Sequence, residues 1–120
     1  MDGVRETTYF SALALRSLGR NDEAEKLLRD LLDAARNLAK APAKIDYFAT
    51  SLPAMLLFED DLQHRQAIHA KLLEAQAHLG LGEKSAAEKL LHEILRDDPN
   101  HALAADLLSS LDAEETHANG

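Results

Sequence analysis

Apolar residues recur every three or four positions through most of this chain, the spacing of one face of an α-helix. The clearest stripe lies in residues 24–38, with charged residues mostly on the opposite face. Its members are Ala24, Leu27, Leu28, Leu31, Leu32, Ala35 and Leu38. Further stripes occupy residues 62–79, 87–95 and 103–111. The few β-branched residues never form a run, as strands would require, so the pattern predicts an all-α protein.

One helical sequence motif occurs twice: residues 24–32 read AEKLLRDLL and residues 87–95 read AEKLLHEIL. The copies start 63 positions apart, from 24 to 87, and the same offset relates Leu18-Gly19 to Leu81-Gly82. A glycine that follows a helix can adopt the left-handed conformation that ends it. The chain therefore predicts two helical hairpins, each with a tight glycine-containing turn between antiparallel helices.

The second helix of each hairpin is expected to open with a capping box. Asp22 and Glu25 form a D-x-x-E pattern, and Ser85 and Glu88 form an S-x-x-E pattern at the same 63-residue offset. We expect Asp22 and Ser85 to be the N-cap residues, since their side chains can accept hydrogen bonds from free backbone N–H groups.

A length of 120 residues fits one domain, expected to contain the hairpins at 4–41 and 60–97. Asp60 or Asp61 is expected to cap the first helix of the second hairpin. Asp98-Pro99 predicts the start of a terminal helix over residues 98–112, because proline suits the first helical position. Residues 113–120 are expected to form a frayed polar tail.

Residues 42–59, PAKIDYFATSLPAMLLFE, separate the two hairpins and are too apolar for a linker. Pro53 removes a hydrogen bond from any helix that runs through it. We therefore predict an irregular inserted element: a helix over about residues 43–51, then a bent or second short helix to Phe58.

Composition and charge narrow the expected partners. The chain has no Cys, which excludes disulfides, thiolate zinc sites and a cysteine nucleophile. Its net charge of −8 repels phosphate backbones and anionic lipid headgroups, so neither nucleic acid nor a membrane is an expected partner. The charged N-terminal stretch lacks the apolar region of a signal peptide, and no apolar run is long enough to span a bilayer. These features predict a cytoplasmic protein.

Histidine and acidic residues are the candidates for chemistry. The six histidines are His64, His69, His78, His92, His101 and His117. Glu74 and His78, four residues apart, are the only pair with ligand-like spacing, and two ligands do not make a metal site. Glu59, Asp60 and Asp61 could form a cation site or paired catalytic carboxylates, but helix capping is favoured. We expect no metal, no cofactor and no catalytic activity.

The repeated positions resemble the spaced small and large residues of the tetratricopeptide repeat. In the first hairpin these positions are Leu18-Gly19, Ala24, Leu28 and Leu31. In the second they are Leu81-Gly82, Ala87, Leu91, Ile94 and the closing Pro99. The family repeats about every 34 residues, so residues 42–59 account for most of the longer period here. The resemblance implies a short right-handed superhelix that serves as a non-catalytic protein-interaction module.

The resemblance also implies where a ligand would bind, because the first helix of each hairpin lines the concave face of such arrays. The corresponding positions here are Glu6, Tyr9, Leu13, Arg16, His69, Leu72 and Gln76. The family members that clamp a terminal carboxylate need Lys and Asn near Tyr9 and Leu13, and this chain has neither. Tyr9 and Leu13 could instead pack on residues 42–59. The expected partner is a peptide, a partner domain or a second copy in a homodimer.

A second resemblance concerns IDYFATSLPAMLLFEDDL, residues 45–62, followed by a repeat hairpin. It is similar to the helical-repeat region at the end of large bacterial proteins that carry an uncharacterised, carbohydrate-related domain. This resemblance implies an alternative role, as a structural or oligomerising part of a larger enzyme.

Overall fold

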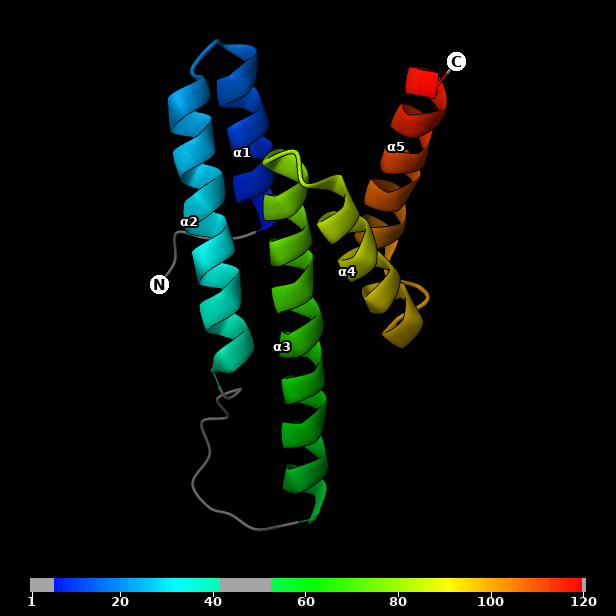
Figure 1. Ribbon diagram of the computed structural model, residues 1–120. Helices are drawn as coiled ribbons and strands as arrows, with labels where there is room; N and C mark the ends of the chain where they lie inside the picture. Colours follow the sequence, from blue (N-terminus) through cyan, green and yellow to red (C-terminus); the bar gives the residue numbers. More distant parts are fainter. Residues whose placement is uncertain (1–5, 42–52, 120) are drawn as a thin grey trace.

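The computed structural model describes residues 6–41 and 53–119, and within them the side chains of 6–41 and 61–113. Five helices form this part of the chain: α1 (Glu6–Ser17), α2 (Asn21–Lys40), α3 (Pro53–Gly80), α4 (Lys84–Asp97) and α5 (Ala102–Asn119). The described residues contain no strand, which confirms the all-α prediction. Figure 1 shows that α1, α3 and α5 run in one direction, while α2 and α4 return in the opposite direction.

The two hairpin turns have the same geometry at the predicted 63-residue offset. Gly19 and Gly82 both adopt a left-handed backbone, with φ of 80° and 85°. The N–H of Arg20 donates to Leu15 O at 2.9 Å, and the N–H of Glu83 donates to His78 O at 2.8 Å. Both are the six-residue bonds of a Schellman motif, in which glycine avoids the strain of a positive φ. The sequence repeat is therefore also a structural repeat.

The capping-box prediction is wrong at both turns. Helices α2 and α4 begin two residues earlier than expected, after N-cap residues Arg20 and Glu83, and neither N-cap side chain bonds the helix backbone. Each Schellman turn ends on the N-cap residue itself, so the chain enters the next helix before Asp22 or Ser85 is reached.

An exposed ion pair spans the first turn of α2. Arg20 donates from Nε and Nη2 to the Glu23 carboxylate, with Nη2 2.7 Å from Oε1. The hydrogen bond from Arg20 is the main cause that lowers the pKa of Glu23, and the positive charge of Arg20 acts in the same direction. Because the folded-state pKa is the lower one, the pair stabilises the fold above the ordinary pKa of glutamate. This contribution disappears as the pH falls through the folded-state value.

Replacing Arg20 with glutamine is expected to return the pKa of Glu23 toward its ordinary value. An NMR titration of the Glu23 carboxyl carbon measures this shift. Arg29→Gln is the control, since it removes the same charge from an arginine that pairs with Glu25 instead. A Glu23 pKa that stays low in Arg20→Gln contradicts the assigned cause.

Helix α3 starts earlier than predicted, at Pro53, and continues without interruption to Gly80. Proline lacks only an N–H that would be unpaired in the first turn, so Pro53 begins the helix rather than bending it. Asp60 and Asp61 consequently lie inside α3, and their predicted capping role is wrong. The predicted helix over residues 43–51 lies outside the described residues.

The terminal helix also differs from prediction at both ends. Asp98 is the C-cap of α4, and Pro99 lies in the turn that follows. Helix α5 begins at Ala102, where His101 caps it: the Ala104 N–H donates to His101 Nδ1 at 3.2 Å. The backbone of the predicted frayed tail is helical as far as Asn119.

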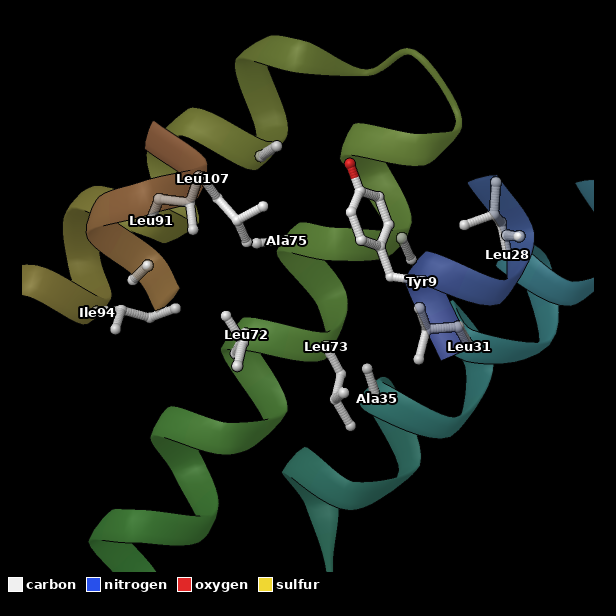
Figure 2. Close-up of a cluster of buried hydrophobic side chains, with 14 of the residues drawn as sticks. Tyr9, Leu28, Leu31, Ala35, Leu72, Leu73, Ala75, Leu91, Ile94 and Leu107 are labelled. Atoms are coloured by element: carbon white, nitrogen blue, oxygen red, sulfur yellow. The ribbon is translucent and has the colours of Figure 1, made fainter. Parts of the chain in front are cut away.

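Helix α3 is central, packing against α1, α2 and α4, while α5 packs against α4. Figure 2 shows Leu72 on the side of α3 that faces Ile94, and Leu73 on the side that faces Leu31 and Ala35. Small buried residues let these helices approach closely, and they include Ala12, Ala24, Ala75, Ala77 and Ala87, each at most 1 % exposed. The amphipathic stripes therefore form one continuous core.

None of the helices described here combines the length and apolar character needed to cross a bilayer.

Candidate interaction groove

An open groove of about 550 Å³ lies where three helices that are not consecutive in the chain come together. Its wall is formed by Tyr9, Phe10, Leu13, Arg16, Leu79, Gly80, Lys84, Leu107, Ser110 and Leu111. These residues come from α1, the end of α3, the first residue of α4, and α5. We call this feature the α1–α3–α5 groove.

Helical periodicity aligns the residues on each wall. On α1, Tyr9, Leu13 and Arg16 follow i, i+4, i+7 spacing and form one stripe. Tyr9 is 7 % exposed, and its ring points from α1 toward α3 (Figure 2), whereas the neighbouring Phe10 is 47 % exposed. The two rings meet edge to face with centroids 5.0 Å apart. One buried ring therefore supports a second ring that a partner can reach.

The opposite wall belongs to α5. Leu107, Ser110 and Leu111 follow i, i+3, i+4 spacing on the face that α5 turns inward. Leu107 and Leu111 are buried, and the Ser110 side chain is exposed. The groove thus combines a mostly apolar wall with a few exposed polar groups, the usual make-up of a binding site.

The described lining residues of the groove carry positive charge only. Arg16 and Lys84 are its charged lining residues, and none of the ten is acidic. Arg16 is exposed near the C-terminal end of α1, and its side chain makes no hydrogen bond or ion pair with the residues the structure describes. This local charge is opposite to the net charge of −8 of the whole chain.

Three of the seven residues predicted for the concave face line this groove: Tyr9, Leu13 and Arg16. Two more, Glu6 and His69, lie near each other outside the groove lining, with His69 Nδ1 3.7 Å from Glu6 Oε1. Glu6 and His69 are both partly exposed. The residues predicted for one concave face therefore lie in more than one place on the structure.

The last two predicted residues, Leu72 and Gln76, are 0 % exposed and so cannot contact a partner in this arrangement. The structure therefore corrects the expectation that Leu72 and Gln76 bind a partner, and the reason is physical. Helix α3 has neighbours on three sides, so positions matched to the open face of α1 are covered when they occur on α3.

Gln76 has an incompletely satisfied side chain. Its Nε2 donates to the Glu6 carbonyl oxygen at 3.3 Å, while its buried Oε1 has no hydrogen-bond partner among the described residues. Leaving a buried acceptor unpaired costs about 1–3 kcal/mol.

Replacing Gln76 with methionine is expected to leave the free energy of unfolding unchanged or to raise it by about 1 kcal/mol, because the unpaired acceptor disappears while a similar volume remains. Urea denaturation followed by circular dichroism measures the change. Leu72→Ala, one turn away, is the comparison and is expected to lose about 2–5 kcal/mol. A loss of that size in Gln76→Met contradicts this explanation.

Seven lining residues were not predicted from the sequence: Phe10, Leu79, Gly80, Lys84, Leu107, Ser110 and Leu111. The apolar stripe of α5 could have predicted that α5 lines the groove. Helices α1 and α3 are the first helices of the two hairpins, and α5 takes the same place after the second hairpin. The exposure of Phe10 had no sequence signal.

A separate polar cluster joins α3 to α4. His78 Nδ1 lies 2.7 Å from Glu83 Oε1, and His78 Nε2 lies 3.2 Å from Glu74 Oε2. Arg36 of α2 approaches the same Glu74 oxygen at 3.8 Å. The Glu74–His78 pair is thus a structural contact. No group of three or more His, Asp or Glu among the described side chains is arranged to hold a metal ion.

Within the acidic run Glu59, Asp60 and Asp61, the structure describes only the side chain of Asp61. The Asp61 carboxylate pairs with Arg65 at 3.0 Å. The side chains of Glu59 and Asp60 lie outside the described set.

No family model matches the chain, and no solved structure is significantly similar to it.

Proposed function

We propose that this protein is a non-catalytic interaction module whose α1–α3–α5 groove binds a segment of a partner protein. The observation that carries the proposal is the meeting of three non-consecutive helices around one mostly apolar hollow. Phe10, half exposed beside the buried Tyr9, offers the kind of aromatic contact that dominates binding energy at interfaces.

We further propose that the helices stack as a short tetratricopeptide-like superhelix. Two hairpins with the same turn, 63 residues apart, support this arrangement. In it, α5 acts as the first helix of a third, incomplete unit. The helices α1, α3 and α5 would then share the concave face, and the contribution of all three to the groove lining supports this arrangement.

Peptide display with randomised 12-residue segments tests the proposal. Peptides selected on the wild-type chain are synthesised, and their dissociation constants are measured by fluorescence anisotropy. We expect Phe10→Asp to weaken binding at least about tenfold, a change of about 1.4 kcal/mol. Leu18→Asp is the matched control, because Leu18 is a 71 % exposed hydrophobic residue outside the groove lining.

Equal binding by wild type and Phe10→Asp overturns the groove as the binding site, provided that circular dichroism shows both chains folded. Light scattering after size exclusion tests the homodimer. A stable dimer that Phe10→Asp dissociates would replace the external partner with a second copy of the chain.

A further inference from the structure

We propose that the segment bound in the α1–α3–α5 groove carries a carboxylate side chain among apolar residues, and that Arg16 binds this carboxylate. The inference rests on the proposed function and adds the chemistry of the partner. It identifies Arg16 as the residue that selects acidic segments over neutral ones.

The distribution of charge is the first argument. The chain has 21 acidic residues against 13 lysines and arginines. The groove reverses this balance among the described residues, since these line it with Arg16 and Lys84 and with no acid. A local cationic site on an acidic protein favours an acidic partner at that place and disfavours acidic segments elsewhere on the surface.

The ion pairing of Arg16 is the second observation that supports the proposal. Four other arginines each lie within 4 Å of an acid of this chain: Arg20 with Glu23, Arg29 with Glu25, Arg36 with Glu74, and Arg65 with Asp61. Arg16 has no such partner among the described residues. Its planar guanidinium keeps its donors available for a bidentate bond to a carboxylate.

The apolar walls argue against a free inorganic anion and for a peptide. Leu13 lies one turn before Arg16 on α1, and Leu79 and Leu111 complete the wall around it. Apolar side chains of a bound segment would cover these leucines and exclude water, which strengthens the charge-assisted hydrogen bond. A nucleic acid would need many cations along a track, whereas the described lining of this groove contains only Arg16 and Lys84.

The carboxylate is assigned to a side chain and not to a chain terminus. In the tetratricopeptide repeats that this chain resembles, a terminal carboxylate is clamped by Lys and Asn near the positions that Tyr9 and Leu13 occupy here, and this chain has neither there. A second copy of this chain is also disfavoured, because two molecules each with a net charge of −8 repel one another.

The test is the amino-acid composition of selected peptide pools. Randomised 12-residue peptides without a free carboxyl terminus are displayed and selected in parallel on four chains: wild type, Arg16→Gln, Arg16→Glu and Arg29→Gln. Arg29→Gln is the matched control, since it removes the same charge from an exposed arginine of α2 that does not line the groove.

We expect Asp and Glu to be enriched in the pools from wild type and Arg29→Gln, and this enrichment to vanish with Arg16→Gln. Arg16→Glu is expected to enrich Lys and Arg instead. For synthetic peptides from the wild-type pool, exchanging the acidic residue for its amide is expected to weaken binding about tenfold for wild type. The same exchange should have little effect for Arg16→Gln.

The outcomes separate the two proposals. Pools that are enriched in apolar residues but not in acids overturn the inference and leave the proposed function standing. Acid enrichment that persists in Arg16→Gln also overturns the role of Arg16. A selection that enriches no peptide on the folded wild-type chain overturns both proposals.

Discussion

Replacement of Leu28 by alanine is expected to lower the free energy of unfolding by about 3 kcal/mol, within the range of about 2–5 kcal/mol for leucines in cores. Leu28 is 0 % exposed and belongs to the buried cluster to which all five helices contribute. Its side chain touches the position of Gly80 near the end of α3, so truncation leaves a cavity at the junction of the two hairpins. The loss combines reduced hydrophobic burial with the unfilled cavity.

Urea denaturation followed by circular dichroism measures this loss. A domain of this size is stable by about 5–15 kcal/mol, so the midpoint should fall substantially. The matched control is Leu18→Ala, which removes the same atoms from a side chain that is 71 % exposed and should change stability by no more than about 0.5 kcal/mol. Equal effects at Leu28 and Leu18 would contradict the described packing.

The second large effect is expected from Gly80→Ala. A Cβ at this position would lie 2.5 Å from Leu28 Cδ2 and 2.8 Å from Leu28 Cδ1, both far inside van der Waals contact. Because Leu28 is enclosed on all sides, its methyl groups have little room to move. We expect the added methyl group to lower the free energy of unfolding by about 1–3 kcal/mol, although alanine is the better helix former.

A double-mutant cycle separates this steric effect from a general intolerance of alanine. In a Leu28→Ala background the cavity accepts the new methyl group, so Gly80→Ala should cost less there or even stabilise the chain. Gly82→Ala is the control. Its Cβ would meet nothing within 4 Å, but its φ of 85° strains any other residue, which costs about 1–3 kcal/mol.

The Gly82→Ala cost should be the same with and without Leu28. A Gly80→Ala cost that is likewise unchanged by Leu28→Ala would rule out the contact with Leu28 as its cause.

Gly80 and Gly82 show how far the sequence could be interpreted. Both belong to one G-L-G stretch, and the repeat pattern correctly assigned the turn to Gly82, whose counterpart is Gly19. The counterpart of Gly80 is Ser17, which is exposed. Nothing local distinguishes the two positions. The difference arises because Leu28 of α2 packs against the end of α3, a contact between segments about fifty residues apart.

The helix boundaries also separate what the local sequence predicts from what tertiary packing decides. The 63-residue offset and the apolar stripes correctly predicted both hairpins, because periodicity and glycine turns act within a few residues. The starts of α3 and α5 were predicted wrongly. Pro53 and His101 begin these helices in place of Asp60 or Asp61 and Asp98. Several polar residues could cap each helix, and the packing of the whole helix decides which one does.

The sequence by itself determined the all-α class, the two hairpins and their matching turns, because each depends on local hydrogen bonding and on the placement of apolar residues along one helix. Only the tertiary structure decided which of those residues a partner could reach. It buried Leu72 and Gln76, left Phe10 half exposed, and brought α5 opposite Arg16. The reason is that exposure depends on how many neighbours a helix has. Helix α3 packs against three others, whereas one side of α1 faces the groove.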